Sequence, residues 1–150
     1  MKIPLAVEEF YGGIRALKSC MIHARHVGGF IKFIIDTGSP HTIIGTADAS
    51  RLKIPITSLA QPDLEKPIAG LNNTKLNLKI MKDTKLSFAD DSGKMNVVEF
   101  PVYVNCDVIP DIRGQKTQGV PSVLGVDFLL KNSLKLIFDP NKKIAFLEKD

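Results

Sequence analysis

The sequence predicts an all-β protein with one or two short helices. Apolar and polar residues alternate with a period of two in several stretches, for example at Leu76, Leu78 and Ile80, as in strands that bury one face. Turn-forming clusters such as residues 90–93, DDSG, separate these stretches. Only two short segments carry helix signals. Many short strands with regular turns are typical of a sandwich or a closed sheet.

The N-terminal half is expected to hold a β-hairpin and a short helix. Apolar runs at 17–25 and 30–36 flank the turn-rich residues 26–29, HVGG, which we expect to connect two strands. Residues 46–52 predict one or two helical turns with Thr46 as the N-cap. The first ten residues are expected to be irregular.

Strands dominate the C-terminal half. Leu86 and Phe88 continue the alternation, and residues 98–104 predict a return strand that Pro101 places at a sheet edge. Residues 125–131 predict a strand end that runs into a short helix. Two further elements are expected, namely an irregular segment at 107–121 and a hairpin with strands 134–138 and 143–147 around residues 139–141.

Composition and charge indicate one ordinary globular domain spanning residues 1–150. Hydrophobic residues make up 44% and charged residues 24% of the chain, and the net charge is +4. The basic residues are scattered, so we do not expect nucleic-acid binding. No apolar run is long enough to cross a membrane, and Glu8 and Glu9 interrupt the stretch where a signal peptide would be apolar. A cytoplasmic protein without membrane contact is therefore expected.

The sequence predicts no metal site and no cofactor. Cys20 and Cys106 form no C-x-x-C pattern, so they predict two free buried thiols, with a single disulfide as the alternative. His23 and His26 lie three residues apart on an expected strand, where they would face opposite sides.

The most informative stretch is residues 33–45, FIIDTGSPHTIIG. Asp36 follows three apolar residues, where an unpaired carboxylate is costly to bury, and Gly38 permits a sharp turn. Two interpretations stand side by side. Asp36 is either a catalytic carboxylate presented on a rigid loop or a turn-forming residue.

Two motifs resemble the retropepsin-like aspartic proteases, the single-domain family that includes the retroviral enzymes. Residues 33–45 resemble the family's active-site loop, and residues 122–129, SVLGVDFL, resemble its hydrophobic-hydrophobic-Gly element. Residues 67–72 resemble its flap more weakly. The resemblance covers about residues 17–148, with 1–16 as an extension or edge strand. It implies a closed barrel, and it implies substrate contacts for Ile68, Ala69, Gly70, Leu71, Val123, Leu124 and Gly125.

The same resemblance implies a homodimeric endopeptidase. Such proteases need two carboxylates, and only Asp36 is followed by Thr-Gly; Asp48, Asp63, Asp111 and Asp127 are not. Each chain would contribute one Asp36 across a two-fold axis. Thr37 would brace the two loops, Gly38 would bring a backbone N–H to the carboxylates, and Ser39 would bind their outer oxygens. The implied substrate is an extended polypeptide.

Departures from the family keep an alternative open. Val126 stands where retroviral enzymes often carry an Arg, which puts dimer stability in question. Residues 83–96 and 107–121 are additional length. His41 is either a neighbour of the two carboxylates or a solvent-facing turn residue, and the second is favoured. The alternative function is a catalytically silent or latent dimerisation or peptide-binding module. In the latent form, residues 1–15 would cover the cleft until they are removed.

The buried core is expected to include residues from every long strand. They are Ile34, Ile35, Ile43, Ile44, Leu78, Ile80, Phe100, Val102, Val123, Leu124, Leu136 and Phe138.

Overall fold

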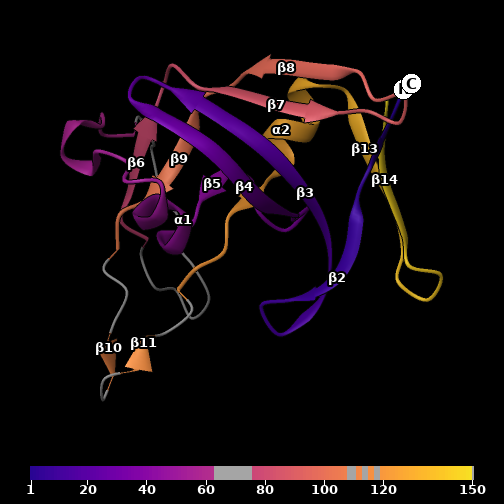
Figure 1. The fold of residues 1–150 in the computed structure, drawn as a ribbon, viewed down its shortest axis with the longest axis horizontal. Helices are drawn as coiled ribbons and strands as arrows, with labels where there is room; N and C mark the ends of the chain where they lie inside the picture. Colours follow the sequence, from indigo (N-terminus) through magenta and orange to yellow (C-terminus); the bar gives the residue numbers. More distant parts are fainter. Residues whose placement is uncertain (63–75, 108–110, 113–114, 117–118, 150) are drawn as a thin grey trace.

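A large curled sheet and a small second sheet make up most of the computed structural model (Figure 1). The structure describes residues 1–62, 76–107, 111–112, 115–116 and 119–149. The protein is therefore mostly β, as predicted.

The large sheet has the strand order β6-β9-β5-β12-β4-β3-β7-β8, with β2 paired to β3. It curls into half a barrel, and within the described residues its end strands β6 and β8 do not pair with each other. The prediction of a closed barrel is thus not confirmed. The strands are β2 (Ala6–Phe10), β3 (Gly13–Ala24), β4 (Val27–Ile35), β5 (Ile43–Ile44), β6 (Leu78–Met81), β7 (Lys85–Ala89), β8 (Met95–Glu99), β9 (Val102–Asn105) and β12 (Val123–Leu124).

The first ten residues form strands, so the prediction that they are irregular was wrong. β1 (Lys2–Pro4) pairs with β14 (Ile144–Lys149), which forms a hairpin with β13 (Leu134–Asp139). The side chain of Ile3 is buried in the core. Because β1 finds its partner more than 140 residues along the chain, local sequence could not reveal it. The C-terminal hairpin was predicted correctly.

The two predicted helices are present, but one cap differs. α1 spans Thr46–Arg51 and α2 spans Val126–Lys131; a short 3-10 helix, η1, spans Ile56–Ser58. Gly45, not Thr46, occupies the N-cap of α1. The Thr46 hydroxyl instead accepts a hydrogen bond from the Val120 N–H at 2.9 Å, so this side chain serves a distant segment.

Two other boundaries shift for backbone reasons. The β3–β4 turn consists of Arg25 and His26, with His26 at φ +61°, so Gly28 and Gly29 belong to the strand and not to the turn. The return strand predicted over 98–104 is interrupted at Pro101, which has no N–H to donate. Its first part, β8, is an edge strand as predicted, whereas β9 lies inside the sheet.

The segment 107–121 contains a small strand pair, and the cysteines are free. β10 (Asp111–Ile112) pairs with β11 (Gln115–Lys116), so the segment is not wholly irregular. Cys20 is buried, and burial raises the pKa of its thiol to about 12. Cys106 is only half-buried, contrary to prediction.

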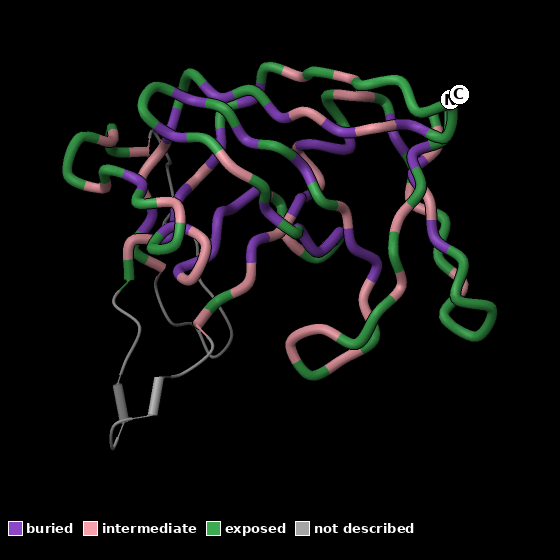
Figure 2. Tube along the Cα trace, in the orientation of Figure 1, coloured by how far each residue is buried: buried purple, intermediate pink, exposed green. Residues whose placement is uncertain are grey.

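The core lies between the curled sheet, α2 and the small sheet (Figure 2). Most predicted core residues are buried, and Ile80, Val123 and Leu136 are half-buried. Phe138 is 38% exposed, so its prediction was wrong. It pairs with Ala145 near the turn of the β13–β14 hairpin, away from the core residues that Leu136 contacts.

The turn between β7 and β8 contains a carboxylate, Asp90, that makes the stability of the folded protein depend on pH. The Asp90 carboxylate accepts hydrogen bonds from the Ser92 hydroxyl at 2.6 Å, from the Ser92 and Lys94 N–H groups at 3.0 Å and from the Asn96 amide at 3.3 Å. These bonds, the Ser92 hydroxyl first, lower the pKa of Asp90 to about 2. A carboxyl group with a lower pKa in the folded state than in the unfolded state stabilises the folded state at pH values above its unfolded-state pKa. This contribution is lost as the pH falls toward the folded-state pKa.

We therefore expect Asp90→Asn to reduce stability at neutral pH and to weaken the acid dependence of unfolding. The contribution of Asp90 should disappear between about pH 4 and pH 2, because the unfolded carboxyl titrates at the top of that range. Urea unfolding at about pH 7 and pH 3 measures both effects, with the exposed neighbour Asp91→Asn as control. An equal loss of stability on acidification in wild type and Asp90→Asn would contradict the assignment.

Candidate active site

Asp36 stands at the end of β4, against β12. The Asp36 N–H donates to the Leu124 carbonyl and the Ile34 N–H to the Ser122 carbonyl, each at 3.0 Å. β12 runs parallel to β4 on one side and antiparallel to β5 on the other. The chain therefore leaves β4 at Asp36, turns, and returns as β5 on the far side of β12. We call residues 36–42 the Asp36 loop.

The turn holds one oxygen of the Asp36 carboxylate. The Gly38 N–H donates to Asp36 Oδ1 at 2.9 Å, and the Ser39 N–H donates to the Asp36 carbonyl at 3.2 Å. Among the described residues no further hydrogen bond reaches the carboxylate, which is half-buried, while Thr37 and Gly38 are exposed. Asp36 is thus a turn-forming residue whose second oxygen is available to another group.

Ser39 and His41 stabilise the return of the loop. The Ser39 hydroxyl donates to the His41 carbonyl at 2.7 Å, and not to Asp36. The His41 ring packs edge-on against Tyr103, with ring centroids 4.9 Å apart. His41 is consequently half-buried and not solvent-facing as favoured from the sequence.

The loop also rests directly on Gly125, at the start of α2. A Cβ atom on Gly125 would lie 2.5 Å from the His41 carbonyl and 2.7 Å from the Ser39 carbonyl oxygen. The Val126 N–H donates to the Ser39 carbonyl at 2.8 Å, and the Asp127 N–H to the Pro40 carbonyl at 3.2 Å. The loop carbonyls therefore satisfy N–H groups of α2 that have no partner within the helix.

Asp127 is a residue of this site whose contacts sequence reasoning missed. Its carboxylate accepts from the Thr42 N–H at 2.9 Å, from the Thr42 hydroxyl at 2.8 Å and from its own neighbour's N–H, that of Phe128, at 2.7 Å. The buried Thr42 hydroxyl accepts in turn from the Gly125 N–H at 3.0 Å. Asp127 is thus a positioning residue that ties the end of the Asp36 loop to α2. An acid in the first turn of a predicted helix was the available signal.

We expect Asp127→Asn to destabilise the protein by about 1–3 kcal/mol, because an amide nitrogen would face a Thr42 donor. In the folded fraction we expect kcat of any cleavage to fall with little change in KM, since the loop and not the substrate is disturbed. Urea unfolding and steady-state kinetics measure these effects. The control is Asp83→Asn, an exposed acid. Wild-type stability and kcat in Asp127→Asn would contradict the positioning role.

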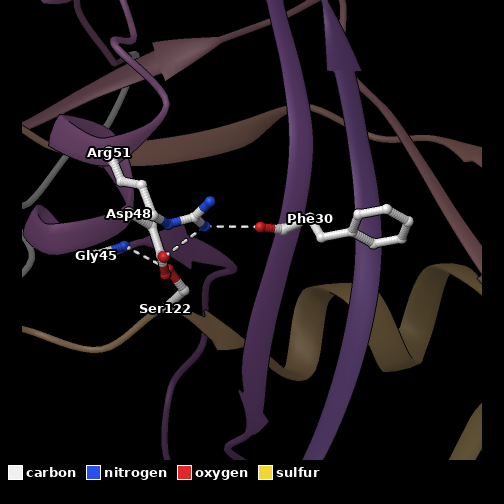
Figure 3. A network of polar contacts seen from close by, with 5 residues as sticks. All are labelled: Phe30, Gly45, Asp48, Arg51 and Ser122. Atoms are coloured by element: carbon white, nitrogen blue, oxygen red, sulfur yellow. Dashed lines mark hydrogen bonds and ion pairs between the residues drawn. The ribbon is translucent and has the colours of Figure 1, made fainter.

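A second network, drawn in Figure 3, fixes the segment before β12. The Ser122 hydroxyl donates to Asp48 at 2.6 Å and accepts from the Gly45 N–H at 2.9 Å. Arg51 bonds the other Asp48 oxygen at 2.9 Å and reaches the Phe30 carbonyl of β4 at 2.6 Å. α1 thereby joins β4 to the segment that leads into β12.

The structure brings the loop that contains Asp36, Thr37, Gly38 and Ser39 together with Val123, Leu124 and Gly125. The expected flap residues Ile68, Ala69, Gly70 and Leu71 lie outside the described residues. Among the residues described, no group of three or more His, Cys, Asp or Glu side chains could hold a metal ion. In the same part of the chain, no helix is long and apolar enough to cross a membrane.

Comparisons with known proteins bear on the family and the fold. A family model described as aspartyl protease matches residues 22–128. A retropepsin-like aspartic protease from Rickettsia conorii has a similar structure, with a TM-score of 0.55 and 18% identity over 99% of this chain and 91% of that one. EIAV protease, complexed with the inhibitor HBY-793, gives a TM-score of 0.50 and 17% identity over 87% of this chain and 100% of that one. No curated protein matches.

Proposed function

Because the chain belongs to the aspartyl protease family, we propose that it is an aspartic endopeptidase whose active site contains two copies of Asp36, one from each chain of a homodimer. The observation that carries the proposal is the Asp36 carboxylate. One oxygen is held by Gly38 N–H and the other has no partner among the described residues. Thr37 is exposed beside it, where it could reach the same loop of a second chain.

The proposed chemistry follows from two adjacent carboxylates. Two such groups cannot both ionise readily, so they share one proton, as is known for aspartic protease pairs. The ionised Asp36 takes a proton from water as the water attacks the scissile carbonyl. The protonated Asp36 donates to the carbonyl oxygen and stabilises the developing charge. No covalent intermediate is needed.

The substrate is proposed to be an extended polypeptide beside β12. Val123 is half-buried and is the β12 side chain that can contact it, whereas Leu124 and Gly125 are buried and support the Asp36 loop. The role of Ile68, Ala69, Gly70 and Leu71 as a flap over the substrate remains part of the proposal. Backbone hydrogen bonds to the substrate, bound as an added strand, would supply affinity that does not depend on the substrate's sequence.

The test is cleavage of an unfolded protein between about pH 3 and pH 8 by wild type and by Asp36→Asn. Cleavage by wild type alone supports the proposal. A folded dimer that binds peptide but cleaves at no pH would favour the silent module instead. Residues 2–4 and 6–10 are paired strands, which argues against a latent form in which the N-terminal segment covers the cleft.

A further inference from the structure

The outer face of the large sheet carries a band of residues across four strands that is apolar except for Ser87 of β7. Register places Phe30, Met21, Ser87 and Val97 side by side on β4, β3, β7 and β8, and Met95 lies in the next row. Phe30 is 61%, Val97 60%, Met95 58% and Met21 39% exposed. Figure 3 shows the Phe30 ring pointing away from the Asp48 network. The exposed face of a sheet is usually polar, so these exposed apolar side chains indicate a surface that binds another protein chain.

The band reaches the sheet's edge at β8, and its pairing with β7 shows which of its backbone groups have no partner among the described residues. Lys94 and Phe100 bond back toward β7, through the Asp90 N–H to the Lys94 carbonyl and the Phe100 N–H to the Thr84 carbonyl. Because hydrogen-bonded and non-hydrogen-bonded pairs alternate along an antiparallel ladder, the backbone N–H and carbonyl groups of Met95, Val97 and Glu99 point away from β7. The Glu99 carbonyl is already bound by Lys131 Nζ at 3.0 Å. Met95 and Val97 therefore carry the available edge groups.

We propose that β8 pairs with β8 of a second copy of this chain, antiparallel about a two-fold axis at Asn96. In this register Met95 of each chain lies opposite Val97 of the other, and these two pairs exchange four backbone hydrogen bonds. A two-fold axis at Val97 would instead require the Glu99 carbonyl that Lys131 occupies. An axis at Val98 would leave Met95 unpaired.

Side chains favour the same arrangement. The Met95 and Val97 side chains of both copies form one cluster, and in each copy Ser87 lies between this cluster and the Met21 and Phe30 side chains. In this register Lys94 lies opposite Val98 of the copy and Glu99 lies opposite Gly93, so no like charges face each other across the interface. β8 contains no proline, and its register with β7 shows no bulge, so it lacks common protections of an exposed edge.

This interface is separate from the proposed pairing of Asp36 loops, because the two share no residue. Both are isologous, so a chain that uses both forms a tetramer or a larger array. The two proposals can therefore fail independently.

Cysteine cross-linking tests the register. In a Cys106→Ser background, with Cys20 buried and unreactive, Asn96→Cys would place two Cα atoms about 4.5 Å apart at the axis, within disulfide range. Val98→Cys would leave its thiols about 13 Å apart, four residues out of register. We expect at least about tenfold faster covalent dimer formation for Asn96→Cys under mild oxidation. Equal rates, or no dimer, would overturn the proposal.

Val97→Lys gives a second measurement that does not depend on a disulfide. A lysine at the open edge should abolish the β8 contact and lower the particle mass measured by light scattering by at least half. Circular dichroism checks the fold, and cleavage per chain should be unchanged. Asp36→Asn should leave Asn96→Cys cross-linking unchanged, so loss of cleavage and loss of this interface are separable. An unchanged mass in Val97→Lys would overturn the interface.

Discussion

Asp36→Asn is expected to abolish peptide-bond cleavage while the fold remains intact. The amide can neither accept a proton from water nor share a proton with a second carboxylate, so the loss should be at least about 10²–10⁴-fold. The fold should persist because the Gly38 N–H can still donate to the Asn side-chain oxygen, which replaces Asp36 Oδ1. Cleavage of an unfolded protein substrate, run beside urea unfolding, measures both consequences.

Asp83→Asn is the matched control, because Asp83 is exposed and lies in the connection between β6 and β7. Cleavage that survives Asp36→Asn, in a sample free of wild type, would exclude Asp36 as the catalytic carboxylate.

Mixing experiments extend the Asp36→Asn prediction to the dimer. If each site needs one Asp36 from each chain, exchange with an equal amount of Asp36→Asn chains leaves about a quarter of the dimers with two wild-type copies. Activity per wild-type chain should therefore fall to about half. Activity that stays proportional to the wild-type chains would show that one chain suffices, and the homodimeric site would have to be abandoned.

The parts of this site that are local in sequence could be predicted. Asp36 and Gly38 lie within three residues of each other, and their hydrogen bond follows from the D-T-G turn alone. The apolar run at 30–36 also identified the strand before the turn, whereas the short strand β5 after it was not predicted. The stretch 122–129 was found through its resemblance to a family, since its own sequence says only that a strand meets a helix.

What sequence could not provide is pairing between distant residues. Thr42 and Asp127 are separated by 85 positions, and neither belongs to a motif whose chemistry names the other. The strand β1 was missed for the same reason. Ile3 pairs with Leu147, 144 positions along the chain, and nothing in the local sequence indicates that partner. Period-two patterns give the face that a strand buries but not its partner.

Gly125→Ala is expected to cause the largest loss among changes outside the Asp36 carboxylate. The new methyl carbon would lie 2.5 Å from the His41 carbonyl and 2.7 Å from the Ser39 carbonyl oxygen, distances that no Cβ contact sustains. These are backbone atoms, so no side-chain rotation relieves the clash. Overpacking of this kind costs about 1–3 kcal/mol or more.

The clash should also reach the chemistry, because the displaced atoms belong to the Asp36 loop. The loop would have to move away from α2, which breaks the hydrogen bond from the Val126 N–H to the Ser39 carbonyl. Small displacements of a catalytic group cost up to about 10²-fold in rate. We therefore expect lower kcat in the fraction that remains folded, together with a lower urea midpoint.

Gly28→Ala is the control that separates this contact from the general effect of adding a methyl group to glycine. A Cβ on Gly28 meets no atom within 4 Å, and this glycine also lies in the large sheet, in β4. Its substitution should change the free energy of unfolding by no more than about 0.5 kcal/mol. If Gly125→Ala were as harmless as Gly28→Ala, the Asp36 loop would not depend on its contact with α2. The Asp127–Thr42 hydrogen bonds would then have to position the loop without it.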